Sequence, residues 1–296
     1  MKTKTKIFLA VFASFALLSI IIGISMAGVE SSNFQFPSSF SKQVGLVKIE
    51  GIINESNHIV KKINGFRDDD NIAAVLLRID SPGGAVAPSQ EIYQAVKNCA
   101  VKKPTIVSMG AVAASGGYYI ASGATRIFAN GGTLTGSIGV IMEFPRYNKL
   151  LEKIGVSIEI LAAGKLKDAG SPFRELNQNE REYFDNLLKD THKQFIDDVC
   201  DGRSMEFENV KLLAEGQIFT GNQAHSNGLI DTLGTFDDAK NYILETCELP
   251  ETTVFLEKSK KEKYDFMEEF FLKTPIKNLF SGFHKSGIYY ICESLL

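Results

Sequence analysis

The chain has 296 residues, of which 44% are hydrophobic and 23% charged, and its formal net charge is -3 at pH 7. That composition is typical of a folded protein, and the small negative charge offers no general attraction to nucleic acid. The four cysteines lie far apart, with no CxxC pair and no metal-ligand spacing. The sequence therefore predicts no metal site and no cofactor, and it leaves the redox state of the cysteines open.

The N-terminal segment combines a lysine-rich start with a long apolar run. Three lysines within the first six residues precede a stretch over 7–27 that holds no charged residue. A run of that length can cross the ~30 Å hydrocarbon core as a helix, and the lysines place its start in the cytoplasm. The alternative is a cleaved signal peptide, because Ser-Met-Ala at 25–27 resembles a processing site. The run is longer than a usual signal sequence, so we expect residues 1–27 to anchor the chain in the inner or plasma membrane.

The rest of the chain, expected outside the cytoplasm, alternates between strand and helix patterns. A serine-rich linker over 28–43 comes first. Strands are expected over 44–53, 72–80, 104–110 and 156–164, and helices over 58–66, 87–100, 177–203, 206–215 and 235–247. This alternation predicts an α/β domain over 44–250 with a mostly parallel sheet. Residues 251–296, which are lysine-rich and then aromatic-rich, are interpreted as an appendage of unknown role outside the main sheet.

Ser115 is the first candidate for chemistry. It follows a buried strand and lies in AASGGYY, among residues too small to shield it. Glycines permit the sharp strand-to-helix turn that an exposed nucleophile needs, and a helix starting there presents free N–H groups to an oxyanion. The simpler interpretation of the same pattern is a helix N-cap beside a pair of packing glycines.

A second candidate is the SPGG loop that contains Gly83 and Gly84. Two glycines at the end of a buried strand leave backbone N–H donors exposed, as an oxyanion hole requires. In isolation, a plain strand-to-helix turn explains the pattern equally well.

The third candidate is the lysine pair in GKLKDAGSPFR. A serine hydroxyl needs a base to take its proton, and a lysine amine can do so when desolvation lowers its pKa. Lys165 and Lys167 lie two residues apart, so a strand would put both on one face and the spacing alone does not choose between them. Either lysine could equally be an ordinary surface residue.

The four histidines limit the other options. His58, His192 and His284 are expected on the surface, and the chain has no HExxH motif for zinc hydrolysis. Within the folded core only His225 follows Ser115 at a place from which it could reach the serine, so a Ser-His-Asp triad stays a minor alternative.

Five blocks, in order, resemble the signal peptide peptidase A family in its short bacterial form: RIDSPGG, ASGGYYIA, TGSIGV, KDAGSPFR and GQIFTGNQAHSNGLIDTLG. The similarity runs from about residue 44 to 247. The SGGYY block and the TG–QA–GLID–LG pattern are specific to this family, whereas SPGG is shared across the wider Clp protease/crotonase fold. The resemblance implies a crotonase-like spiral α/β fold and a ring-shaped homo-oligomer, in which each site takes its serine and its lysine from adjacent subunits.

The resemblance also implies a role for each candidate residue. Ser115 would be the nucleophile, Lys167 the general base, and Ser137 in TGSIGV the group that orients the lysine amine. The oxyanion donors would be the N–H groups of Gly116 and of Gly84 or its neighbour Gly83. The expected activity is that of a membrane-anchored serine endopeptidase acting on released signal peptides and other hydrophobic peptides.

Two other functions fit the same sequence features. A crotonase-type acyl-CoA enzyme is possible because one fold hosts several chemistries, but it would want acidic residues near the oxyanion loop, where the sequence has only Asp80. An inactive membrane-bound scaffold would show the same fold without peptidase activity.

Overall fold

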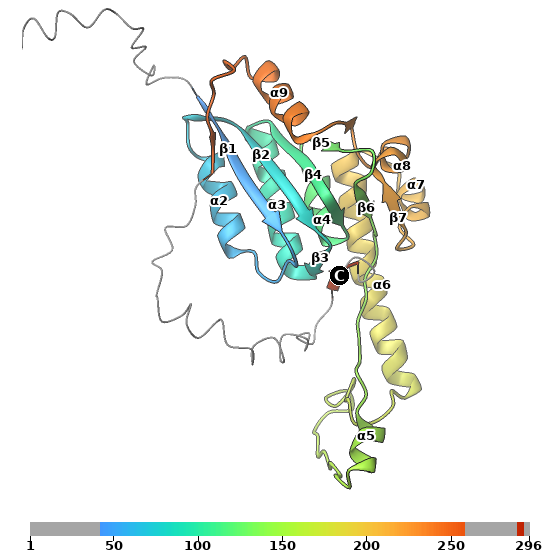
Figure 1. The fold of residues 1–296 in the computed structure, drawn as a ribbon. Helices are drawn as coiled ribbons and strands as arrows, with labels where there is room; N and C mark the ends of the chain where they lie inside the picture. The colour runs from blue at the N-terminus through green and yellow to red at the C-terminus, as the bar shows by residue number, and fades with distance from the viewer. Residues whose placement is uncertain (1–41, 258–288, 293–296) are drawn as a thin grey trace, which may run out of the picture. The chain divides into compact units, whose positions relative to one another are not determined.

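The computed structural model describes residues 42–257 and 289–292, and Figure 1 shows its ribbon. The expected membrane anchor over 7–27 lies outside these residues. Within the two described ranges, no helix is both long enough and apolar enough to cross a membrane.

The central element is a sheet with the strand order β7-β6-β4-β2-β1-β9. In addition, β5 pairs with β4, and β8 pairs with β5. Its strands are β1 (Gln43–Glu50), β2 (Ile72–Ser81), β4 (Thr105–Ala114), β5 (Arg126–Ala129), β6 (Leu134–Gly136), β7 (Ile218–Thr220), β8 (Thr232–Leu233) and β9 (Phe255–Leu256). The pair β6–β7 is antiparallel, and the other pairs of this sheet are parallel. The prediction of an α/β fold with a mostly parallel sheet is confirmed.

Helices connect and cover these strands. They are α2 (Asn57–Arg67), α3 (Val86–Lys102), α4 (Gly116–Ser122), α5 (Asn148–Lys153), α6 (Gln178–Arg203), α7 (Phe207–Leu212), α8 (Gly221–Ser226) and α9 (Phe236–Thr246). The longest, α6, begins at a capping box in which the Asn177 side chain and the Glu180 side chain each accept the other's backbone N–H. This reciprocal bonding fixes where α6 starts and therefore where the preceding loop joins it.

Both faces of the sheet are buried, as the near-continuous apolar run of β2 indicated. Val75 and Leu77 belong to one apolar cluster with residues of α2, α3, α4 and α6, while Ala74 and Leu76 belong to a second cluster with α9. Because successive strand residues point to opposite faces, this alternation packs helices on both sides of β2.

One predicted strand is wrong. Residues 156–164 form no strand, and the side chains of Val156, Ile158 and Ile160 are exposed. The apolar–polar alternation is there, but no described strand lies beside the segment to share hydrogen bonds with it. We call residues 142–176, which contain this segment and α5, the arm; Figure 1 shows α5 beside the first turns of α6.

Beyond residue 250, where the sequence indicated an appendage outside the main sheet, the described residues form two short strands. Strand β9 pairs with β1, and β10 (Tyr289–Ile291) pairs antiparallel with β3 (Gly83–Ala85). Strands of two or three residues are too short to leave a periodic signal in the sequence. The structure therefore uses parts of the C-terminal region in both sheets.

Candidate active site

Ser115 occupies a strained turn between β4 and α4. Its φ is 51° and its ψ is -116°, a conformation that side-chain-bearing residues rarely adopt and that costs about 1–3 kcal/mol. The turn is held because the Ser115 N–H donates to the Gly136 carbonyl oxygen at 2.8 Å. The side chain is buried, and its Oγ has no hydrogen-bond partner among the described residues. The Ser115 hydroxyl is therefore held in place although it makes no hydrogen bond to the described residues that would stabilise the fold.

The SPGG loop lies directly against Ser115. Gly83 has a φ of 104°, and a Cβ added to it would stand 2.7 Å from the Gly116 nitrogen and 3.1 Å from the Ser115 Cβ. A Cβ on Gly116 would in turn stand 3.2 Å from the Gly84 nitrogen. Only glycines fit positions where backbones approach this closely. The backbone amides of Gly84 and Gly116 are therefore neighbours beside the serine.

The hydrogen bonds separate the two candidate donors of the loop. The Gly83 N–H already donates to Ser81 Oγ at 3.1 Å. On one edge of β3, Gly83 O and Ala85 N–H bond to Ile53, so the N–H of Gly84 faces the opposite edge. The Gly116 N–H is at the first position of α4, where a helix has no internal acceptor for it. Gly84 and Gly116 fit the role of oxyanion donors better than Gly83.

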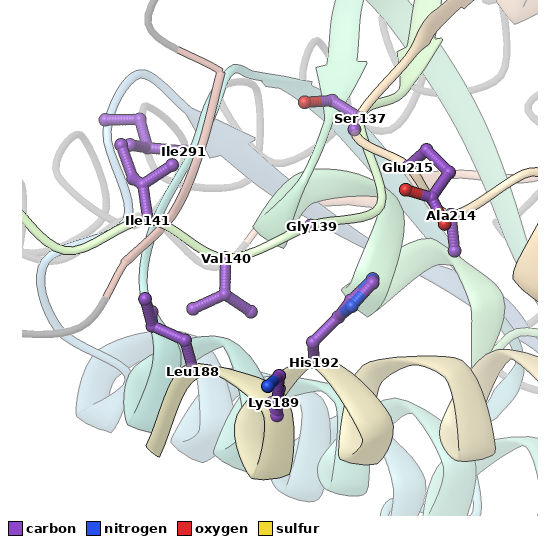
Figure 2. Close-up of a pocket in the computed structure, with 11 residues that line it drawn as sticks. Ser137, Gly139, Val140, Ile141, Leu188, Lys189, His192, Ala214, Glu215 and Ile291 are labelled. Carbon is purple, nitrogen blue, oxygen red and sulfur yellow. The ribbon is translucent and has the colours of Figure 1, made fainter. Parts of the chain in front are cut away.

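Ser137 is brought to the same place by strand pairing. It follows β6, whose Gly136 pairs with Ala114 just before Ser115. Its φ of 50° is also positive, and its N–H donates to the Gln217 carbonyl oxygen at 2.8 Å. Ser137 lines a cavity of about 370 Å³ with residues from α6, the loop after α7 and β10 (Figure 2). The serine predicted to orient the base therefore lines this cavity, and the residue before it, Gly136, accepts the Ser115 N–H.

Neither candidate lysine reaches this place within one chain. Lys165 and Lys167 are exposed residues of the arm, and no hydrogen bond joins Lys167 to Ser115 or Ser137 among the described residues. The arm packs on the start of α6, where a Cβ on Gly170 would meet Phe184 at 3.4 Å. Thr191, whose carbonyl oxygen accepts a bond from the Tyr290 hydroxyl, lies on α6 seven residues and about 10 Å further along.

A partly exposed ion-pair network, of which only Glu180 is buried, shapes the arm next to Lys167. Arg174 donates to Asp168 Oδ2 at 2.8 Å and to the Asp168 carbonyl oxygen at 2.9 Å. The same guanidinium donates to Glu180 at 2.6 Å, and Glu180 also accepts the Asn177 N–H at 3.0 Å. These bonds, above all those from Arg174, lower the pKa of Glu180 to about 2. The turn that carries Lys167 is thereby tied to the first turn of α6.

The histidines differ from the expectation at one position. His225 is exposed at the end of α8, and no hydrogen bond joins it to Ser115. His192, expected on the surface, lines the cavity beside Ser137, and its Nε2 is buried without a partner among the described residues (Figure 2). It lies on α6, whose polar sequence gave no sign that a cavity borders this turn. His192, rather than His225, therefore shares a cavity with Ser137.

Comparisons with known proteins agree with these observations. The family model described as Peptidase family S49 matches residues 97–249, and that of Clp protease matches residues 43–130. A Synechocystis sp. protein named "Putative protease" is 42% identical over 208 residues, which are 70% of this chain and 75% of that protein. An Enterococcus faecium protein named "Putative signal peptide peptidase SppA" is 34% identical, with 72% of this chain and 66% of that protein covered.

A longer relative also matches. The Arabidopsis thaliana protein named "Serine protease SPPA, chloroplastic" is 36% identical over 213 residues. The match covers 72% of this chain but only 32% of that protein. The chain thus spans three quarters of one relative, just under two thirds of another and about a third of this longer one.

Proposed function

This chain belongs to peptidase family S49, in the signal peptide peptidase A group, and from that premise we propose that it is a serine endopeptidase with a Ser115–Lys167 dyad. The observation that carries the proposal is the Ser115 hydroxyl. It is buried, lacks a partner among the described residues, and is held at a strained turn beside the amides of Gly84 and Gly116. Strain that serves no packing purpose is concentrated at functional sites.

In the proposed reaction, the neutral amine of Lys167 takes the proton of Ser115 while Oγ attacks the carbonyl carbon of a peptide bond. The negative charge that develops on the carbonyl oxygen is stabilised by the N–H groups of Gly84 and Gly116. The carbon–nitrogen bond then breaks, the lysine ammonium gives its proton to the leaving amine, and an acyl-serine ester remains. Lys167 next takes a proton from water, whose oxygen attacks the ester carbonyl. The bond to Ser115 Oγ then breaks, Oγ takes the proton back from the lysine ammonium, and the acid is released.

The base is proposed to come from a neighbouring subunit. Lys167 is exposed on the arm, away from the serine of its own chain. The arm also carries a group of exposed apolar side chains: Leu150, Ile154, Val156, Ile158, Ile160, Leu161 and Leu166. Exposed apolar patches of this kind favour a protein contact, and the contact would desolvate a lysine within it. This supports a ring in which the arm of one subunit completes the site of the next, with Ser137 orienting the amine.

Substrate and location complete the proposal. The Enterococcus relative is named a signal peptide peptidase, which supports hydrophobic peptides such as released signal peptides as substrates. The apolar run over 7–27 supports a single-pass anchor, with the peptidase domain over 44–250 on the extracytoplasmic side of the membrane. A site beside the bilayer would meet such peptides as they leave it.

The rival functions differ from a peptidase in their reaction with a fluorophosphonate probe. An acyl-CoA enzyme or an inactive scaffold would leave Ser115 unlabelled, whereas an activated serine forms a covalent adduct. Asp80, the acid near the loop, accepts the Val112 N–H at 3.0 Å and so has a structural role. Labelling that mass spectrometry maps to Ser115, and that Ser115→Ala removes, would support the peptidase.

The dyad is tested by alanine variants assayed on a hydrophobic peptide. We expect Ser115→Ala and Lys167→Ala each to lower kcat/KM by about 10³-fold or more, because each removes half of the proton-transfer pair. The double variant should be no worse than either single one, since the two residues act as a unit. Lys165→Ala is the matched control: it removes an exposed lysine two residues away and should leave the activity unchanged. If Lys167→Ala is active and His192→Ala is not, the base has been misassigned.

A further inference from the structure

Residues 164–171 of the arm, which carry Lys167, form a series of backbone-bonded turns. The Lys167 N–H donates to the Gly164 carbonyl oxygen at 3.1 Å, and the Ser171 N–H donates to the Asp168 carbonyl oxygen at 3.2 Å. Bonds between residues three apart close β-turns, so the backbone on both sides of the lysine is fixed. Lys167 is exposed, but the turn that presents it is already folded in a single chain.

Gly170 places this turn against two aromatic rings. Its φ is 81°, and a Cβ added to it would stand 2.6 Å from the Phe144 ring and 3.4 Å from the Phe184 ring. The two rings are themselves in contact, with their centroids 4.5 Å apart. Phe144 lies at the start of the arm and Phe184 on α6, so the turn packs on both segments. Only glycine fits this close to the rings.

Arg174 holds the other side of the turn. Its guanidinium donates to the carboxylate and to the carbonyl oxygen of Asp168, at 2.8 and 2.9 Å. It also donates to both carboxylate oxygens of Glu180, at 2.9 and 2.6 Å. The planar fork of a guanidinium suits such paired bonds, and a lysine, with three donors, could not make all four. One side chain therefore connects the residue after Lys167 to the first turn of α6.

Arg174 is also the counter-charge of both carboxylates. Besides Lys167, the charged residues on this part of the arm and at the start of α6 are Lys165, Asp168, Arg174, Glu175, Glu180 and Arg181. Among the described residues, no cation other than Arg174 pairs with Asp168 or Glu180. The hydrogen bonds to Glu180 and to Asp168 raise the pKa of Arg174 above its ordinary value, so the guanidinium stays charged. Without Arg174, the Asp168 carboxylate would lie unpaired one residue from Lys167.

We infer that Arg174 is a positioning residue for the proposed base: it holds the turn that presents Lys167, and it neutralises the carboxylate next to that lysine. The inference rests on the proposed peptidase function and adds the group that sets the pH range of its activity. An unpaired carboxylate beside an amine favours the charged ammonium, whereas only the neutral amine can take the proton of Ser115. Loss of Arg174 should therefore both displace the amine and raise the pH that activity requires.

Two variants of Arg174 separate the charge from the position. The activity of the full chain on a hydrophobic peptide is measured across the pH range, and the pH of half-maximal kcat is compared. We expect Arg174→Gln to raise that pH by about 0.5–1 unit, because a nearby carboxylate loses its partner, and also to lower the maximal kcat. Arg174→Lys keeps the charge but loses the fork. It should lower the maximal kcat while the pH of half-maximal kcat stays that of the wild type.

Changes at Asp168 test the charge from the other side. Adding Asp168→Asn to Arg174→Gln removes one negative charge and so restores the net charge of the network. The pH of half-maximal kcat should then return to the wild-type value. Asp168→Asn alone keeps the bonds from Arg174 to the Asp168 backbone and to Glu180, and it should lower that pH. This variant covers the case in which Arg174→Gln does not fold.

Arg146→Gln is the matched control. Arg146 is another arginine of the arm, and its side chain is 37% exposed against 40% for Arg174, but it pairs only with the exposed Glu175, at 3.3 Å. Its loss should leave the pH of half-maximal kcat unchanged. An equal rise in Arg146→Gln and Arg174→Gln, or no rise in Arg174→Gln, would overturn the inference. A purely structural arginine would lower activity at every pH without moving the profile.

The state of the amine can also be followed without catalysis. Full-length Ser115→Ala chains, with and without Arg174→Gln, are treated with acetic anhydride, which reacts with neutral amines only, at a series of pH values. Mass spectrometry then compares the rate of acetylation at Lys167 with that at Lys211 on α7. We expect Arg174→Gln to move the Lys167 profile to higher pH by the same amount and to leave Lys211 unchanged; an unmoved Lys167 profile would overturn the inference. A moved profile in a protein whose Ser115 takes no fluorophosphonate label would support the role of Arg174 and refute the peptidase.

Discussion

Glu180 is the residue on which the attachment of the arm depends. It is a buried carboxylate that accepts bonds from Arg174 and from the Asn177 N–H, and Arg174 also holds Asp168, the neighbour of Lys167. The same carboxylate closes the capping box of α6. One charge therefore joins the start of a helix to the turn that presents the proposed base.

The pH dependence of that attachment can be predicted. The pKa of Glu180 falls from an ordinary value of 4.5 to about 2, so its charge stabilises the folded state fully above pH 4.5 and loses that effect as the pH falls towards 2. Glu180→Gln keeps a capping side chain but loses the ion pair. We expect its Tm to lie below that of the wild type at pH 7, with the difference shrinking from pH 4.5 downward. Thermal unfolding followed by circular dichroism at pH 7, 5 and 3.5 measures the difference in Tm. A difference in Tm that stays the same at all three pH values would contradict the lowered pKa of Glu180.

At this scale the sequence locates the serine side of the site better than the lysine side. Ser115, Gly84 and Gly116 come from short loops that directly follow buried strands, and parallel strands bring such loops together. Lys167 lies on the arm, whose position depends on contacts that no local pattern encodes. His192 was missed because a cavity next to a helix depends on what faces it, and in this case those neighbours are more than 20 residues away in sequence.

Two glycines in helices show how tightly the elements pack behind the site. In α6, a Cβ on Gly202 would overlap the carbonyl oxygen of Ser122 at the end of α4, the helix that starts beside the nucleophile. In α2, a Cβ on Gly65 would meet nothing within 4 Å. The first glycine is needed for the crossing of two helices, and the second is not.

The two positions form a matched pair of substitutions. Gly65→Ala should raise the free energy of unfolding by about 0.5–1 kcal/mol, because alanine loses less backbone entropy in a helix. Gly202→Ala should lower it by about 1–3 kcal/mol, because α6 must move away from α4. Urea denaturation of both variants measures the two changes. Stabilisation by both substitutions would show that α6 and α4 do not pack as closely as described.

Elements with strong periodicity could be predicted, and those that depend on distant partners could not. The long amphipathic pattern over 177–203 matches α6, and the apolar run over 72–80 matches β2, to within a residue or two at either end. Residues 156–164 have the alternating pattern of a strand but form none, because no described strand of the same chain lies beside them to share backbone hydrogen bonds. Strand β10 carries almost no pattern, yet pairing with β3 orders it.

The arm also indicates how subunits are expected to assemble into an active protein. It presents exposed apolar residues and Lys167 on one segment, while the serine, its amide neighbours and Ser137 lie together at the sheet. If one chain held a complete site, its apolar arm residues and its Lys167 would not be expected to be exposed. The arrangement favours an assembly in which the exposed segment of one subunit is buried against the next.

Mixing two inactive variants tests that assembly. In a mixed ring of Ser115→Ala and Lys167→Ala subunits, some interfaces pair an intact Lys167 from one chain with an intact Ser115 from its neighbour. If both residues of a site came from the same chain, no mixture could form a complete site. We therefore expect activity to return when the two proteins exchange subunits, and to disappear on dilution to monomers. Native mass spectrometry must establish that exchange occurred, and mixed oligomers without activity would refute the shared site while leaving the dyad chemistry intact.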